Sequence, residues 1–395
     1  MIRILSSLAA AVAISGAAAL AQEKFAITVP PYLQNLTGNE VTILWETNAP
    51  GTGWVEIAPD DGKHFYNTEK EKHFDSRLGI KSVGTLHKVT VTGLEPGHSY
   101  VYRVISQQAT TDSRTSKVMY GDYASTKVNK VELPSFTTPS PEKKEFRFAV
   151  INDIHGDSAL VYDLFKNCDL SKIDFVVGNG DLVTSLNNEN ILPQKFLRHA
   201  ANIFGYSKPL VATRGNHETR GRCAQSFTDY FPSVNDGLPY YTFTYGDTFF
   251  IVADCGEDKP DSDIEYYGRA EFDKFREAEA RWLESVIESD EYRKARYHVA
   301  FLHIPPVGER MWHGQSEINR LFLPIFNKAG LDVMFCGHTH SYRYWKPDEY
   351  GNSFPIIVND NEAVALTEIS DKVISVEIIG RDGKKVQILN FKQPK

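Results

Sequence analysis

Residues that can bind metal ions stand directly after several short apolar runs of this 395-residue chain. The first group is Asp153-Ile154-His155, which follows the apolar run 146–151. Side chains two residues apart in an extended chain point to the same side, so Asp153 and His155 can face one common centre. Because carboxylate and imidazole groups are ligands for transition metals, this pair predicts one half of a metal site.

Similar groups follow four other stretches of the chain. A lone histidine at a strand end is more often a hydrogen-bonded core residue than a ligand, and a Gly-Asp pair is usually a turn. Five such groups, each after a different predicted strand, favour a shared metal centre. The four further groups are Gly180-Asp181, Gly215-Asn216-His217-Glu218, His303, and Gly337-His338-Thr339-His340.

The elements that must position these groups alternate between apolar strands and helical stretches. We expect strands at 146–151, 173–177, 210–213, 240–245, 248–253, 297–302, 331–335, 355–358, 363–369, 373–379 and 386–391. We expect helices at 158–166, 191–204, 223–230, 270–289 and 317–327. This alternation is typical of an α/β domain with largely parallel central strands, whose ligands gather at the carboxyl ends of the strands.

The first part of the chain has an all-strand pattern. Short apolar-polar alternations at 41–45, 53–57, 88–91 and 100–104 are separated by turn-forming residues at 48–51, 60–62 and 95–97. This spacing predicts an all-β sandwich of about 100 residues. The segment 94–100 resembles the fibronectin type III signature, in which the hydroxyl of Tyr100 bonds back to the backbone near Leu94 and Pro96. We place this domain at 22–139, with a linker at 134–144, and the α/β domain at 140–395.

Residues 1–21 have the layout of a cleavable signal peptide. Arg3 precedes an apolar stretch at 8–20, and Ala19-Leu20-Ala21 is a suitable cleavage site. About 13 apolar residues are fewer than a spanning helix needs, and no later run is long enough. We therefore expect an exported protein, either periplasmic or secreted; an uncleaved N-terminal anchor is the alternative.

Composition excludes several other classes of protein. Hydrophobic residues make up 42% and charged residues 24% of the chain, which is typical of a globular protein. The formal net charge of −8 does not favour a positively charged surface for binding nucleic acid. Four cysteines, Cys168, Cys223, Cys255 and Cys336, stand singly, so they predict neither a cysteine metal site nor a dense disulfide framework.

The five groups resemble the motifs of the calcineurin-like metallophosphoesterase superfamily: D-x-H, G-D, G-N-H-[DE], H and G-H-x-H. This resemblance extends from about residue 146 to 345, and with the β-rich front it points to exported phosphatases with a purple-acid-phosphatase-type N-terminal domain. It implies an α/β domain whose central β-sandwich is flanked by helices. It also implies one metal held by Asp153, His155 and His340, another held by Asn216, His303 and His338, and Asp181 bridging both.

The resemblance implies a metal-dependent phosphoric ester hydrolase. In such a phosphatase, a metal-bridging hydroxide attacks phosphomonoesters in line, and His217 protonates the leaving group or stabilises its charge. Mixed imidazole and carboxylate ligands favour two ions of Mn, Fe, Zn or Co over Ca. Purple enzymes of the family place a tyrosine ligand where this chain has Thr184, and lack the counterpart of His155, so we expect no ferric-tyrosinate colour.

Residues beside the motifs are candidates for binding a small phosphate ester. Asn216 and the guanidinium groups of Arg214, Arg220 and Arg222 are candidates for contacts with the phosphate, and Trp312 or His313 for the leaving-group pocket. Glu218 either orients His217 or caps the local structure. Two functional alternatives stay open: a phosphodiesterase on the same metal core, and a surface-binding protein whose α/β domain keeps metal for stability only.

Overall fold

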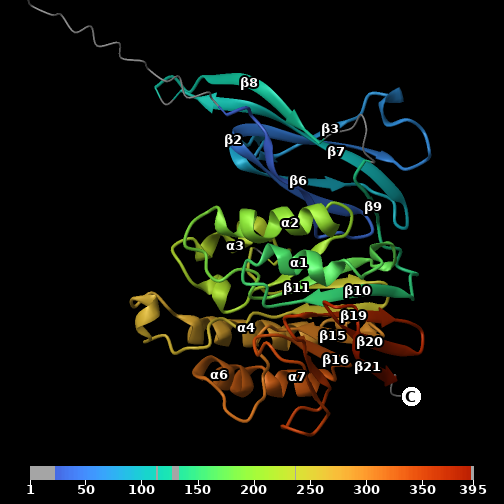
Figure 1. Cartoon of the computed structure of the whole chain (residues 1–395), viewed down its shortest axis with the longest axis vertical. Helices are drawn as coiled ribbons and strands as arrows, with labels where there is room; N and C mark the ends of the chain where they lie inside the picture. The colour runs from blue at the N-terminus through green and yellow to red at the C-terminus, as the bar shows by residue number, and fades with distance from the viewer. Residues whose placement is uncertain (1–22, 113, 127–132, 236, 393–395) are drawn as a thin grey trace, which may run out of the picture.

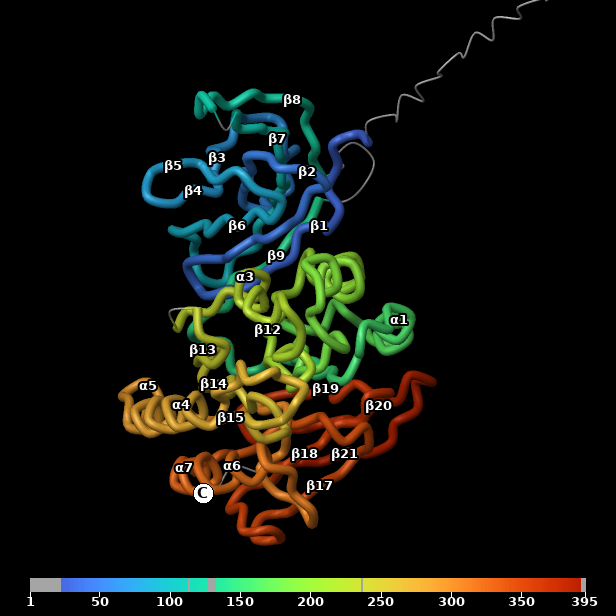
Figure 2. The backbone as a smooth tube through the Cα atoms, turned by 90° about the vertical axis from the view of Figure 1, so that its left-hand side faces the viewer, coloured from blue at the N-terminus to red at the C-terminus, as the bar shows by residue number. Residues whose placement is uncertain are grey.

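The computed structural model describes residues 23–112, 114–126, 133–235 and 237–392. The expected signal peptide at 1–21 therefore lies outside the described residues. Figures 1 and 2 show a β-rich part, made by residues before 138, stacked on a larger part in which strands and helices alternate.

The β-rich part is built around one long strand, β2 (Glu40–Pro59). Its neighbours are β1 (Ile27–Gln34), β3 (Lys72–Phe74), β6 (Gly84–Thr92) and β7 (Ser99–Thr111), and β8 (Val118–Ser125) and β9 (Ser135–Thr137) pair with β7. A two-stranded pair, β4 (Ser76–Arg77) and β5 (Ile80–Lys81), extends from it. The first half of β2 pairs with β6 and the second with β7, around a core that includes Trp45, Val55 and Tyr102. This arrangement confirms the all-β N-terminal sandwich.

Residues 48–51, which we expected to form a turn, lie inside β2. The pairing of β2 with β6 shifts register between Glu46 and Gly51, so the strand contains an irregularity instead of reversing direction. Asn48 is held by Ala26: the Asn48 N–H donates to the Ala26 carbonyl at 3.0 Å, and the Ala26 N–H donates to the Asn48 side chain at 2.9 Å. These bonds keep the turn-forming residues extended.

The tyrosine expected to fix the corner of the sandwich does so. The backbone N–H of Glu95 donates to the Tyr100 hydroxyl at 2.8 Å. The ring of Tyr100 stacks on Phe136 with centroids 5.8 Å apart. Phe136 belongs to β9, so part of the stretch that we predicted as a linker is a strand, because this one buried aromatic residue packs into the core.

The larger part contains two six-stranded sheets. The first has the order β12-β11-β10-β19-β20-β21 and the second β13-β14-β15-β16-β18-β17. The first comprises β10 (Phe146–Ile151), β11 (Phe175–Asn179), β12 (Leu210–Thr213), β19 (Ala363–Ile369), β20 (Val373–Gly380) and β21 (Lys385–Lys392). The second comprises β13 (Tyr241–Tyr245), β14 (Thr248–Val252), β15 (Tyr297–Phe301), β16 (Val333–Cys336), β17 (Arg343–Trp345) and β18 (Ile356–Val358).

Parallel pairing is confined to the strands that carry the metal-binding motifs and their neighbours. The strands β10, β11 and β12 are parallel to one another, and so are β14, β15, β16 and β18. Antiparallel strands extend both sheets outward. The carboxyl ends of parallel strands lie at one edge of a sheet, so the motifs that follow them are brought to the same edge.

Helices cover the outer face of each sheet (Figure 1). One layer contains α1 (Ser158–Phe165), α2 (Arg198–Ala200) and α3 (Phe227–Tyr230), and the other contains α4 (Phe272–Ile287), α5 (Asp290–Lys294), α6 (His313–Leu321) and α7 (Leu323–Ala329). Between the sheets lies an aromatic core in which Phe148, Phe250 and Phe301 have ring centroids 5.7–5.9 Å apart. The expected central β-sandwich flanked by helices is therefore confirmed.

Two expected helices differ in detail. The stretch expected as one helix at 317–327 forms α6 and α7, with Pro324 in the first turn of α7, because proline has no N–H for a continuing helix. The stretch expected at 191–204 consists of α2 between two π-helical turns, Pro193–Leu197 and Ala201–Gly205. The short strand β17 was not predicted.

The β-rich part packs on the helical layer that contains α2 and α3. Val29 and Tyr32 of β1 belong to the same buried cluster as Phe204. The Tyr32 hydroxyl donates to the carbonyl of Tyr230 at 3.0 Å, and the Tyr102 hydroxyl donates to the carbonyl of Tyr206 at 2.7 Å. Apolar packing and polar bonds thus both join the two parts.

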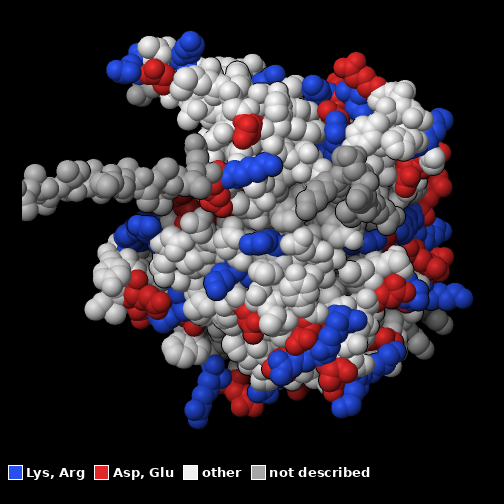
Figure 3. All heavy atoms as spheres, turned by 45° about the horizontal axis from the view of Figure 1, so that its top comes forward, with Lys and Arg blue, Asp and Glu red and all other residues white. Residues whose placement is uncertain are grey.

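The surface carries charges of both signs. On the face shown in Figure 3, Lys and Arg side chains are mixed with Asp and Glu side chains and separated by uncharged residues. Within the described ranges, no helix is both long and apolar enough to cross a membrane. The four cysteines are all free thiols, and Cys255 and Cys336 are buried.

Candidate metal centre

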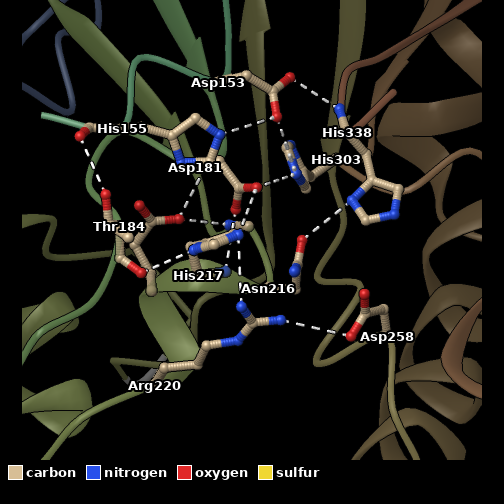
Figure 4. A network of polar contacts seen from close by, with 12 residues as sticks. Asp153, His155, Asp181, Thr184, Asn216, His217, Arg220, Asp258, His303 and His338 are labelled. Atoms are coloured by element: carbon tan, nitrogen blue, oxygen red, sulfur yellow. Dashed lines mark hydrogen bonds and ion pairs between the residues drawn. The ribbon is translucent and has the colours of Figure 1, made fainter. Parts of the chain in front are cut away.

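The structure brings all seven predicted metal ligands together at one edge of the two sheets. Five different strands supply them: β10, β11 and β12 from the first sheet and β15 and β16 from the second. Figure 4 shows most of these side chains pointing toward one another across the gap between the sheets. The seven residues are Asp153, His155, Asp181, Asn216, His303, His338 and His340.

Asp153, His155 and His340 form one cluster that can hold a cation. The Nε2 atoms of His155 and His340 lie 3.0 Å apart, and His340 Nε2 lies 3.2 Å from Asp153 Oδ1. The Asp153 carboxylate is fully buried, whereas the His340 side chain is 47% exposed. The carboxylate of this cluster is therefore buried, and the cluster is open to solvent on the side of His340.

Asp181, His303 and His338 form a second cluster. His303 Nε2 lies 3.0 Å from Asp181 Oδ2, and the amide oxygen of Asn216 lies 3.2 Å from His338 Nδ1. Asp181 also groups with His155 and His217, so its carboxylate lies between the two clusters.

The donor atoms at the centre of the site fit bound cations. Asp153 Oδ1 and His303 Nε2 are buried, and neither has a hydrogen bond of good geometry among the described residues, although His340 Nε2 and Asp181 Oδ2 lie 3.2 and 3.0 Å away from them. Burial lowers the pKa of His303, but Asp181 and Asp153 outweigh it and raise that pKa to about 10, so the local field strongly favours positive charge. Imidazole nitrogens and carboxylate oxygens suit transition-metal ions.

The backbone adopts a left-handed conformation at five of the seven predicted ligands. The φ angles are +53° at Asp153, +51° at His155, +54° at Asp181, +71° at His338 and +50° at His340. Such angles are uncommon outside glycine and cluster at functional sites, where the surrounding structure enforces them. The two motif glycines before Asp181 and Asn216 are required sterically, because a Cβ on Gly180 would lie 2.4 Å from His303 Nδ1 and one on Gly215 would lie 2.2 Å from Asp181 Oδ1.

Backbone carbonyls and amides orient the predicted ligands. His303 Nδ1 lies 2.7 Å from the carbonyl oxygen of Asn179. Because a carbonyl can only accept, Nδ1 carries a proton, which leaves Nε2 as the nitrogen that would bind a cation at the centre. Asn152 donates to Asp153 Oδ2 at 2.7 Å, and the backbone N–H of His338 donates to the same oxygen at 2.8 Å.

Asn359 supports the site and was missed in the sequence. Its side-chain amide donates to Asn152 Oδ1 at 2.9 Å, and its backbone carbonyl accepts from Asn152 Nδ2 at 3.1 Å. It therefore fixes the amide that holds Asp153. Asn359 follows the expected strand 355–358, and this position directly after a strand was the available signal.

Glu218 binds loop backbone instead of the His217 side chain. Its buried carboxylate accepts from the N–H groups of Asp181, Val183 and Gly215 at 2.9–3.0 Å. Burial and the charge of Asp181 raise its pKa to about 7. Of the two roles weighed for Glu218, these contacts match the structural one.

His217 stands beside the clusters with one ring nitrogen directed into the site. Its Nδ1 lies 2.7 Å from the carbonyl of Thr184, which requires a proton on Nδ1. Its Nε2 lies 3.9 Å from Asp181 Oδ2 and 3.4 Å from a guanidinium nitrogen of Arg220 (Figure 4). His217 thus has a fixed tautomer, and its Nε2, which has only the long contacts with Arg220 and Asp181, faces the site.

The arginines and His313 predicted to bind substrate have other partners. Arg214 makes a bidentate ion pair with the buried Asp254, at 2.7 and 3.1 Å, and His313 pairs with Asp273 at 2.9 Å. Arg222 donates to the carbonyl of Asn187. These contacts do not favour phosphate binding by Arg214, Arg222 or His313.

Arg220 is the only one of the three arginines seen in contact with a residue of the centre in the described chain. Two bonds of 2.8 Å to Glu257, which is buried, hold its guanidinium in place, and Asp258 lies 3.4 Å away. A fixed cation therefore stands beside Nε2 of His217.

Comparisons with known proteins agree with this arrangement. The family model for the calcineurin-like phosphoesterase matches residues 146–342, and the model for the purple acid phosphatase N-terminal domain matches residues 29–122. Purple acid phosphatase 18 of Arabidopsis thaliana is 21% identical, over 81% of this chain and 67% of its own length. Acid phosphatase type 7 of Mus musculus is 25% identical, over 77% of this chain and 68% of its own length.

The fold also matches a solved structure. The purple acid phosphatase from yellow lupin seeds superimposes with a TM-score of 0.64, at 14% identity, over 92% of this chain and 74% of that one. The fold and the two domain matches define a metal-dependent phosphoesterase. The chain belongs to the calcineurin-like metallophosphoesterase superfamily and carries a purple-acid-phosphatase-type N-terminal domain.

Proposed function

We propose that this protein is an exported binuclear metallophosphatase that hydrolyses small phosphomonoesters. The observation that carries the proposal is the convergence of seven metal-ligand side chains from five strands, with Asp181 between two clusters. We propose a division of the chain into a signal peptide at 1–21, a fibronectin-like domain at 22–139 and a metallophosphoesterase domain at 140–395.

The residues present fit two transition-metal ions. Asp153, His155 and His340 would hold one ion, Asn216, His303 and His338 the other, and Asp181 both. Two bound ions supply Lewis acidity toward the phosphoryl group and a water-derived nucleophile at neutral pH. The imidazole-rich donor set favours Mn, Fe, Zn or Co.

The protein's own side chains would position the ester and move its proton. His217 Nε2 is placed to donate a proton to the leaving-group oxygen, since Nδ1 stays bound to the Thr184 carbonyl. Arg220 is fixed by Glu257 and adds positive charge on the same side. This charge stabilises the negative charge that develops on the ester oxygens.

A phosphate-ester panel tests the reaction class. Metal-stripped protein is refilled separately with Mn, Zn, Fe or Co and assayed on a monoester and a bis-ester of the same aryl alcohol. We expect turnover of the monoester only after refilling. Preference for the bis-ester would indicate a phosphodiesterase, and two bound ions without turnover of any ester would indicate the surface-binding alternative.

Substitution of predicted ligands tests the site. We expect Asp181→Ala and His340→Ala to lower kcat/KM by more than about a hundredfold. Substitution of a residue that only hydrogen-bonds a metal ligand already lowers metal affinity or activity by about 10- to 100-fold. Circular dichroism checks that the fold remains. Asp122→Ala and His73→Ala, in β8 and β3 of the sandwich, are the matched controls. Full activity in either ligand variant would refute the proposal.

A further inference from the structure

A hollow opens directly beside the predicted ligand His338. Its volume is about 420 Å³. Its walls come from the segment after β15, from the start of α6, and from β17 with the turn that follows it. The lining residues used below are Val307, Arg310, Trp312, Arg343, Trp345 and Tyr350.

Three aromatic side chains line this hollow. Trp312 is 61% exposed, more than any other tryptophan of the described chain, and it lines the hollow. Trp345 and Tyr350 are half-buried, and their ring centroids lie 5.8 Å apart at an interplanar angle of 66°. These rings provide flat apolar surfaces on which another planar group can stack.

The register of β17 explains why cationic and aromatic side chains share the hollow. Side chains alternate between the two faces of a strand, so Arg343 and Trp345 lie on one face and Tyr344 on the other. Tyr344 packs toward Phe391 of β21, with ring centroids 6.1 Å apart. Arg343 and Trp345 therefore face the hollow together.

The two arginines of the hollow differ from those beside the metal centre. Arg214 and Arg220 make ion pairs with carboxylates, and Arg222 donates to a backbone carbonyl. For Arg310 and Arg343, the described part of the chain offers no carboxylate at ion-pair distance. Glu309 is the one acidic residue of the lining, so the hollow has a net positive charge.

The base of the hollow is firmly held. The Gln315 amide of α6 donates to the carbonyls of Pro305 and Val307 at 2.8 and 3.0 Å. Asn319, one turn further along, donates to the carbonyl of Pro306 at 2.8 Å. These bonds fix the segment after His303, which forms one wall of the hollow, against α6.

We propose that this hollow is the leaving-group subsite, and that it selects phosphomonoesters of planar aromatic alcohols that carry a second acidic group. The proposal rests on the function proposed above. With its ester oxygen at His217 Nε2, a substrate bound at the metal centre would extend its alcohol part past His338 into the hollow. The ring would stack on Trp312 and Trp345, and the acidic group would pair with Arg343 or Arg310.

The experiment compares three substrates: 4-carboxyphenyl phosphate, phenyl phosphate and glycerol phosphate. We expect kcat/KM to fall in that order. In Trp312→Ala, the ratio of phenyl to glycerol phosphate should drop about tenfold, mainly through KM. In Arg343→Gln, the ratio of carboxyphenyl to phenyl phosphate should drop by a similar factor. Tyr120→Ala, an equally exposed aromatic on β8, is the control for which both ratios should stay unchanged.

A binding measurement separates this proposal from the proposed function. Calorimetry with 4-(phosphonomethyl)benzoate, which cannot be hydrolysed, should give a Kd about tenfold higher in Trp312→Ala than in the parent protein. This result is expected even if no ester is turned over. Hydrolysis of all three esters with substrate ratios that are the same in all variants would overturn the subsite while leaving the phosphatase intact. Equal phosphonate binding in the parent and Trp312→Ala would overturn it as well.

Discussion

His217 is the residue of the site whose chemistry differs most from that of its neighbours. It groups with Asp181 and His155, yet its Nδ1 is committed to the Thr184 carbonyl, and its Nε2 faces Arg220. A side chain whose Nδ1 is held by a backbone carbonyl and whose Nε2 faces the site suits proton transfer better than metal binding. Its loss should therefore affect the leaving group more than the metal content.

We expect His217→Ala to retain two metal ions and to lose about 10²- to 10⁴-fold in kcat on an alkyl phosphomonoester. The loss should be much smaller for 4-nitrophenyl phosphate, whose leaving group needs no proton. Steady-state kinetics on both esters, with elemental analysis, measure this difference. Equal losses on both esters would contradict a role in protonating the leaving group, and His73→Ala is the control.

Residue types and spacing were enough to predict that five strand-end groups share one centre, and the resemblance to the family implied which seven of their residues would be ligands. The same information was insufficient for the supporting contacts. Asn359 lies 207 positions from Asn152, and nothing local in the sequence marks that pair. Arg214 and Arg220 were predicted to be equivalent, but buried carboxylates on a distant segment, Asp254 and Glu257, decide where each guanidinium points.

Among the structural elements, the loops between strands and helices depend on a few buried anchors. Glu218 alone accepts hydrogen bonds from three backbone N–H groups on two loops, those after β11 and β12. No repeating pattern of a helix or strand satisfies these amides. The geometry around Asp181 is therefore tied to one carboxylate that is not itself a predicted ligand.

We expect Glu218→Ala to lower the free energy of unfolding by about 3 kcal/mol, since a buried acceptor of several hydrogen bonds is lost. Metal affinity should also weaken by about 10- to 100-fold, because Asp181 loses its support. Denaturant unfolding and metal titration measure the two effects. A variant with unchanged stability and metal affinity would contradict this role, and Glu284→Ala, on the exposed side of α4, is the control.

Most strands were predicted from sequence, whereas the eight-residue strands β1 and β8 and the short and irregular elements were not. Long apolar runs such as that of β10 identify a buried strand without tertiary information. The three-residue strands β9 and β17 exist because of their partners, β7 and β18, and their own sequences are too short to show a period. The continuous course of β2 through 48–51 likewise depends on a contact with Ala26.

For the whole molecule, the contact between the sandwich and the helical layer contains a buried acid. Glu46 of β2 is 8% exposed and accepts a hydrogen bond from the Tyr230 hydroxyl at 3.3 Å. Burial raises the pKa of Glu46 to about 7, and the charge of Glu189 adds to this, although the bond from Tyr230 lowers it. The folded protein therefore favours the protonated carboxyl more than the unfolded chain does.

The sign of the pH effect follows from this raised pKa. The contribution of Glu46 to stability is fully present below its ordinary pKa of about 4.5 and is lost as the pH rises through about 7. The Glu46→Gln variant should not lose stability in this way as the pH rises. Above pH 7 its free energy of unfolding should therefore exceed that of the parent by up to about 3 kcal/mol. Below pH 4.5 the two proteins should be equally stable.

Urea unfolding at a series of pH values measures the difference between the two proteins. Glu40→Gln, in the same strand, is the matched control, and its difference from the parent should not change with pH in this way. A Glu46→Gln variant whose stability runs parallel to that of the parent from pH 4 to pH 8 would contradict the assignment.

The left-handed backbone at the centre restricts how such a protein can evolve. At Asp153, His155, Asp181, His338 and His340, an acceptable newcomer must tolerate a positive φ as well as offer a donor atom. Aspartate, asparagine and histidine meet both conditions, whereas β-branched side chains fail the first. Natural variation in metal preference should therefore be limited to exchanges among these three residue types. Threonine or valine at any of the five positions should be lost by selection because it impairs folding, whatever its effect on catalysis.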